Sequence, residues 1–182
     1  MTFKPLEIPD VKLITPNVFG DERGYFKETF RRHLFDEQGI YEDFVQDNCS
    51  MSKKGAVRGL HYQIERPQAK IVMVAKGRVL DVAVDIRKSS PTFGQYVSME
   101  LSDSNHNMLY VPTGFAHGFA VLSDEAVFLY KTSDYYHPEG ERGIKWNDTD
   151  IGIDWKFEDP IISEKDQNWP SLDEIPEQDL FK

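Results

Sequence analysis

Four polar segments that separate apolar runs contain the side chains best suited to chemistry. They hold His61, Lys70, His117 and Tyr130. An imidazole can take or give a proton near neutral pH, a lysine cation can stabilise a developing oxyanion, and a phenol can donate a proton. Each of these residues alone is more often structural, because a histidine beside a strand is usually hydrogen-bonded there and a lysine or tyrosine usually lies at the surface or rim. Their occurrence together is more informative than any one of them.

The segment Pro112–His117 reads Pro-Thr-Gly-Phe-Ala-His and fits the second cupin motif, P-x-G-x-x-H. The first cupin motif needs two histidines separated by one residue, but this chain has His61-Tyr62-Gln63. A cupin metal site needs about four ligands, mostly imidazoles and a carboxylate. The other histidines are placed on a predicted exposed helix, in a loop and before a proline: His33, His106 and His137. The sequence therefore favours a cupin-type barrel without a metal.

Seven segments follow one another along most of the chain, from about Val18 to Asp166. They are Phe19–Gly24, Val45–Asn48, Arg58–Gln63, Asp81–Arg87, Gly114–Phe119, Phe128–Lys131 and Ser163–Asp166. In this order they resemble the dTDP-4-dehydrorhamnose 3,5-epimerase family, and the ordered set is far more specific than any one motif. The resemblance implies a metal-free, cupin-type β-barrel that forms homodimers. It also implies conversion of dTDP-4-dehydro-6-deoxy-D-glucose into dTDP-4-dehydro-β-L-rhamnose.

The resemblance gives catalytic roles to four residues. His61 is the base that removes a proton from carbon, and Asp166 is the carboxylate that orients its imidazole. Lys70 matches the lysine that stabilises the negative 4-oxygen of the enolate. Tyr130 matches the acid that returns a proton on the opposite face of the sugar ring. Judged alone, Asp166 would be assigned to the first turn of a helix, where the helix dipole favours a carboxylate.

The resemblance also implies a set of substrate contacts. Arg23 and Arg58 match arginines that hold the diphosphate, and guanidinium forks suit that group. Tyr136 matches the aromatic residue that stacks on thymine. The remaining contacts are Phe26, Glu28, Gln46, Asn48, His117, Glu141 and Lys165. In the family the segment from Arg23 to Glu28 comes from the neighbouring subunit, and the resemblance implies no cofactor.

The elements that must position these residues are mostly short strands. Apolar runs and alternating patterns predict strands over 71–75, 79–86, 96–101, 108–111, 119–122 and 126–130. Short connections at Lys76-Gly77 and Ser123–Glu125 predict two hairpins. Short helices are expected before Gly39 and after Ser163, which suits a helix N-cap. Many short strands with few peripheral helices favour a mainly β fold, a jelly-roll barrel or sandwich.

The first hairpin leads to a prediction about the cavity. If Lys76-Gly77 is a two-residue loop, Lys70 and Asp81 share one face as diagonal neighbours, and we expect this charged face to line a polar cavity. The other face of the second strand is continuously apolar, and we expect it to pack on protein and to support a dimer. That face carries Leu80, Val82, Val84 and Ile86.

Composition sets the broad class of the protein. A length of 182 residues indicates one domain, residues 1–182. The 31 acidic residues against 21 Lys and Arg argue against nucleic acid and anionic membranes as partners. The lone Cys49 and the lack of an apolar leader or span lead us to expect a cytoplasmic protein. Residues 169–182 are expected to form an arm or to be mobile, and the N-terminal segment to exchange with a partner subunit.

Several other functions remain open from the sequence. A relative could epimerise only C3 or only C5, or act on another 4-keto sugar of the same nucleotide. A barrel of this kind could also bind nucleotide sugars without catalysis, although simple binding needs neither a base nor an opposed acid. A metal-dependent cupin oxygenase is disfavoured by Gln63.

Overall fold

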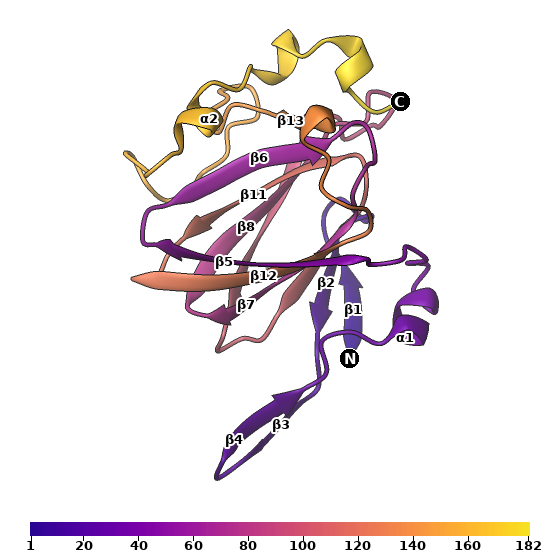
Figure 1. The fold of residues 1–182 in the computed structure, drawn as a ribbon, viewed down its shortest axis with the longest axis vertical. Helices are drawn as coiled ribbons and strands as arrows, with labels where there is room; N and C mark the ends of the chain where they lie inside the picture. The colour runs from indigo at the N-terminus through magenta and orange to yellow at the C-terminus, as the bar shows by residue number, and fades with distance from the viewer.

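Two antiparallel sheets face each other and enclose an apolar interior (Figure 1). The computed structural model describes all of residues 1–182. The six-stranded sheet has the order β1 (Thr2–Pro5), β2 (Lys12–Thr15), β10 (Met108–Val111), β7 (Lys70–Lys76), β12 (Glu125–Thr132), β5 (Gln46–Lys53). The five-stranded sheet has the order β13 (Glu141–Gly143), β6 (Val57–Gln63), β11 (Phe115–Val121), β8 (Arg78–Asp85), β9 (Tyr96–Ser102). This is a jelly roll, which confirms the predicted fold class.

The remaining elements are short. Strands β3 (Val18–Asp21) and β4 (Gly24–Lys27) form a hairpin that projects away from both sheets (Figure 1). Helix α1 spans Arg32–Asp36, and helix α2 spans Glu164–Gln167 with Ser163 accepting a hydrogen bond from the Asp166 N–H, as the expected N-cap does. Three 3-10 turns, η1 to η3, cover Pro138–Gly140, Leu172–Glu174 and Glu177–Asp179. No helix is both long and apolar enough to cross a membrane.

Both predicted hairpins are wrong, because their strands lie in different sheets. β7 pairs with β10 and β12, whereas β8 pairs with β11 and β9. β11 and β12 are likewise separated, since β12 pairs with β5 and β7. The two connections turn corners between the sheets and pack against each other: a β-carbon on Gly77 would lie 2.1 Å from the Glu125 carbonyl oxygen. A short glycine-containing loop therefore serves a corner as well as a hairpin.

The apolar face of β8 is covered by the chain itself. Leu80, Val82, Val84 and Ile86 pack against residues from the segment 144–180, among them Trp155 and Leu172. The face packs on protein as expected, but it is not free to bind a second subunit. Residues after Trp169 lie across this sheet, with three side chains at least nine-tenths buried: Leu172, Ile175 and Leu180.

Candidate active site

One cavity of about 390 Å³ opens between the two sheets and collects most of the predicted site residues. Polar side chains reach it from six strands, from the β6–β7 loop, from the loop before η1 and from α2. The predicted residues that line it are Gln46, Asn48, Arg58, His61, Lys70, His117, Tyr130, Tyr136, Glu141 and Lys165. Because these positions span 120 residues of sequence, the jelly roll and not local spacing brings them together.

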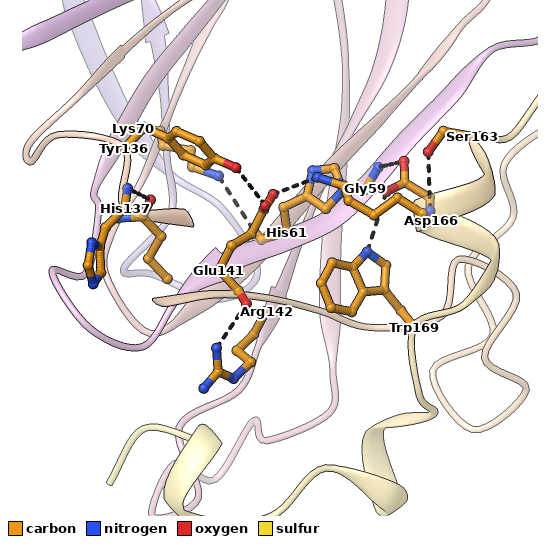
Figure 2. Close-up of polar contacts among 12 residues, drawn as sticks. Gly59, His61, Lys70, Tyr136, His137, Glu141, Arg142, Ser163, Asp166 and Trp169 are labelled. Atoms are coloured by element: carbon orange, nitrogen blue, oxygen red, sulfur yellow. Dashed lines mark hydrogen bonds and ion pairs between the residues drawn. The ribbon is translucent and has the colours of Figure 1, made fainter. Parts of the chain in front are cut away.

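His61 in β6 forms a close pair with Asp166 in α2 (Figure 2). Nε2 of His61 lies 2.6 Å from Oδ1 of Asp166, and the Gly59 N–H donates to Oδ2 across 3.3 Å. Burial opposes ionisation of Asp166, but the bonds from His61 and Gly59 outweigh it and hold the pKa of this carboxyl below its usual value. An ionised carboxylate only accepts hydrogen bonds, so Nε2 carries the proton and Nδ1 is the basic nitrogen.

Lys70 at the start of β7 is buried in the same cavity. Its ammonium group donates to the His61 carbonyl oxygen across 3.4 Å. Burial lowers the pKa of Lys70 to about 8, against the opposing effect of the negative charges of Asp81 and Glu141. The Lys70 side chain is therefore a cation at neutral pH, and its pKa lies only slightly above neutral.

His117 in β11 is paired with Asp81 in β8, and both side chains are buried. Nε2 of His117 lies 2.9 and 3.0 Å from the two carboxylate oxygens, and the ring stacks on Phe128. Burial raises the pKa of Asp81, although His117 and Lys70 oppose this effect, and burial lowers the pKa of His117. Asp81 thus fixes the orientation of the second imidazole in the cavity.

Tyr130 reaches the cavity from β12, in the six-stranded sheet, whereas His61 reaches it from β6, in the five-stranded sheet. A molecule held between the sheets therefore has the imidazole on one side and the phenol on the other. Burial raises the pKa of Tyr130, so the hydroxyl keeps its proton at neutral pH and can act as an acid.

The rim of the cavity is a connected hydrogen-bond network. Glu141, labelled in Figure 2, accepts bonds of 2.8 Å from the Tyr136 hydroxyl and of 2.8 Å from the Lys165 ammonium group. Gln46 accepts from the Tyr136 N–H and donates to the Asn48 side-chain oxygen. Nδ2 of Asn48 is the only buried side-chain nitrogen or oxygen without a hydrogen-bond partner. A buried donor without a partner is costly to stability.

Comparison with known proteins identifies the family. The family profile described as dTDP-4-dehydrorhamnose 3,5-epimerase matches residues 5–174. The chain belongs to this family. The dTDP-4-dehydrorhamnose 3,5-epimerases of Shigella flexneri and Methanothermobacter thermautotrophicus are 56% and 54% identical to it, over 89% and 90% of this chain and 91% and 90% of theirs.

A solved structure shares the whole architecture. It is a dTDP-6-deoxy-D-glucose-3,5-epimerase from Legionella pneumophila in complex with dTDP-4-keto-L-rhamnose. It is 47% identical, with a TM-score of 0.97, and the match covers 100% of this chain and 97% of that one. These findings confirm the family predicted from the seven sequence segments.

Three predicted contacts of the epimerase family lie outside the cavity of their own chain. Arg23 and Phe26 belong to the projecting β3–β4 hairpin, and Glu28 follows it. Arg23 pairs with Asp21, Glu28 pairs with Arg31, and the Phe26 side chain is 68% exposed. Within one chain these residues are therefore separate from the predicted residues that line the cavity.

The cavity also contains residues that the sequence analysis missed. They are Ser50, Gln68, Gly118, Phe119, Phe128 and Thr132. The alternation of β5 and β12 could have indicated Ser50, Phe128 and Thr132, since they share a face with Asn48 and Tyr130. Gln63, which replaces a cupin metal ligand, has a structural role: its amide donates to the Arg66 and Tyr135 carbonyls and accepts from the His137 N–H.

Proposed function

We propose that this chain inverts C3 and C5 of dTDP-4-dehydro-6-deoxy-D-glucose and so produces dTDP-4-dehydro-β-L-rhamnose. The observation that carries the proposal is one cavity with a carboxylate-bound imidazole on one sheet, a protonated phenol on the other and a buried ammonium group that donates to the His61 carbonyl oxygen. This arrangement supplies a base, an opposed acid and a cation for the charge that forms between their two steps.

In the first step Nδ1 of His61 takes the proton from C3 or C5. The 4-ketone acidifies both C–H bonds, and the electron pair of the broken bond moves into an enolate with its charge on the 4-oxygen. Asp166 stabilises the imidazolium that forms, because its carboxylate stays bonded to Nε2. The Lys70 cation stabilises the enolate oxygen, and its buried position strengthens that attraction.

In the second step the Tyr130 hydroxyl gives its proton to the same carbon from the opposite face. The enolate electrons form the new C–H bond, the ketone is restored, and the configuration is inverted. Solvent then returns a proton to the tyrosinate and removes one from the imidazolium. The same pair of groups acts on the second carbon after the sugar has shifted in the cavity.

The rim residues are suited to the nucleotide. We assign the diphosphate to Arg58, the thymine to the face of Tyr136, and further polar contacts to Gln46, Asn48, His117, Glu141 and Lys165. Arg58 is exposed and Tyr136 is 53% exposed, so both are available to a ligand at the cavity mouth. No step requires a metal or cofactor, since His61 and His117 each already bond a carboxylate. Exhaustive chelation should leave turnover intact.

We further propose a homodimer of single-domain subunits, in which the β3–β4 hairpin of one subunit completes the site of the other. The hairpin exposes Val18, Phe19, Tyr25 and Phe26, a group of apolar side chains that a lone subunit leaves in water. Arg23 and Glu28 would then join Arg58 beside the nucleotide of the neighbouring subunit.

The decisive experiment incubates the protein with dTDP-4-dehydro-6-deoxy-D-glucose in deuterated water and follows C3 and C5 by NMR. Deuterium and inversion at both carbons are the expected result. Incorporation at one carbon alone would identify a C3- or C5-only epimerase. Binding without any incorporation would identify a nucleotide-sugar-binding barrel and refute catalysis.

A further inference from the structure

Trp169 has no part in the steps above, yet its side chain contacts the His61–Asp166 pair. Nε1 of Trp169 donates to Oδ1 of Asp166 across 3.4 Å, the oxygen that also bonds Nε2 of His61. Figure 2 shows the indole beside this pair, with its N–H directed at the carboxylate. The rings of His61 and Trp169 meet edge to face, with their centroids 6.4 Å apart.

Gly143 provides the space for the indole. It is the residue of β13 that lies opposite His61 in β6. A β-carbon on Gly143 would lie 2.4 Å from Cε2 and 2.5 Å from Nε1 of Trp169, far inside van der Waals contact. The φ angle of Gly143 is not positive, so the backbone conformation would allow a side chain here. It is the indole of Trp169 that excludes one.

The position of Asp166 depends on contacts at both ends of α2. This helix has four residues, and a helix of one turn has little stability of its own. Ser163 holds the N-terminal end through the Asp166 N–H. Beyond the C-terminal end, the Pro170 carbonyl accepts from the Lys145 N–H across 2.8 Å, which anchors the chain directly after Trp169.

We propose that Trp169 is a positioning residue for the His61–Asp166 pair and that Gly143 is the residue that admits it. The indole holds the carboxylate against the imidazole and shares the negative charge of Oδ1. Trp169 does not line the cavity, so it acts through Asp166. The inference rests on the proposed function only for the role of His61 as base.

The test is Trp169→Phe, which keeps an aromatic ring and removes the donor. NMR of the His61 ring should show a shifted signal of the Nε2-bound proton, because the carboxylate oxygen that accepts this proton has lost its second donor. The kcat should fall several-fold, while KM stays unchanged. Gly143→Ala, which displaces the indole, should reproduce the shift.

Trp155→Phe is the matched control. It removes an indole donor too, here to the Trp146 carbonyl at 2.7 Å, and Trp155 packs in the cluster that covers β8. It should lower stability without moving the His61 signal. A folded Trp169→Phe protein in which this signal stays at its wild-type position would overturn the inference, even if epimerisation is confirmed. The NMR measurement needs no turnover, so it still decides the inference if the proposed function fails.

Discussion

Lys70 and Asp81 belong to different sheets, and their opposite charges act on each other across the space between them. Lys70 begins β7, and Asp81 lies in the middle of β8 with no exposed surface. The Asp81 carboxylate also accepts the hydrogen bond from His117. One buried carboxylate therefore faces both of the basic side chains deepest in the cavity.

The interaction between Lys70 and Asp81 predicts how kcat/KM falls at alkaline pH. Lys70 must be protonated to stabilise the enolate, and its pKa is lowered to about 8, so kcat/KM should fall as the pH rises through about 8. Asp81 raises the pKa of Lys70, so Asp81→Asn should move this alkaline limb to lower pH. Asp85→Asn is the control, because Asp85 lies in the same strand but bonds Arg87. If the alkaline limb of kcat/KM does not move in Asp81→Asn, it reports the titration of a group other than Lys70.

Replacing the base should stop all proton exchange at carbon. His61→Ala should reduce both epimerisation and deuterium incorporation by about 10²- to 10⁴-fold, the usual contribution of general base catalysis. The measurement is NMR of the sugar in deuterated water. Retained exchange in His61→Ala would mean that a different group removes the proton.

Replacing the acid should separate exchange from inversion. Tyr130→Phe keeps the ring and removes only the hydroxyl, so the substrate should still bind and His61 should still remove and return a proton on one face. Deuterium should then enter the substrate while inverted product falls. If exchange and inversion fall in strict parallel, Tyr130 is needed during proton removal, and its role as the opposite-face acid must be withdrawn.

The shared site predicts complementation between two inactive variants. Arg23→Ala removes a contact on the projecting hairpin, and His61→Ala removes the base in the cavity. Mixed under conditions of subunit exchange, the two should regain part of the activity, because each mixed dimer has one intact site. An active protein that stays monomeric at assay concentration would refute the shared site.

The sequence predicted six strands that the structure contains, β7 to β12, but it missed β1 to β6 and β13, and it paired the strands of both hairpins wrongly. The runs expected at 96–101 and 108–111 match β9 and β10 closely, since alternation reports which residues are buried. Alternation does not report which sheet covers them. Lys70 and Asp81 were expected to be diagonal neighbours in one hairpin, and they face each other from two sheets instead. The expectation that this charged face lines a polar cavity is correct for Lys70 alone, since Asp81 does not line the cavity and instead bonds His117, which does.

The family resemblance, and not residue spacing, indicated most of the site. Asp166 lies 105 residues after His61, and no local pattern links the two. Trp169 and Gly143 were missed for a similar reason, because a tryptophan after a short helix and a glycine in a three-residue strand carry no signal until they are placed in contact.

The last prediction tests whether the apolar face of β8 is covered by the chain itself or forms a subunit interface. Leu172 packs on this face and is 8% exposed, so Leu172→Ala should lower the free energy of unfolding by about 2–3 kcal/mol through lost burial and a residual cavity. Ile161→Ala is the control: its side chain is 62% exposed, and the change should stay within about 0.5 kcal/mol. Urea unfolding measures both.

Leu172 lies outside the cavity, so the folded Leu172→Ala variant should keep its kcat and its dimer dissociation constant. If Leu172→Ala weakens dimerisation and leaves the unfolding of the subunit unchanged, the C-terminal residues do not cover this face in solution, and the original assignment of the face to a subunit interface is restored.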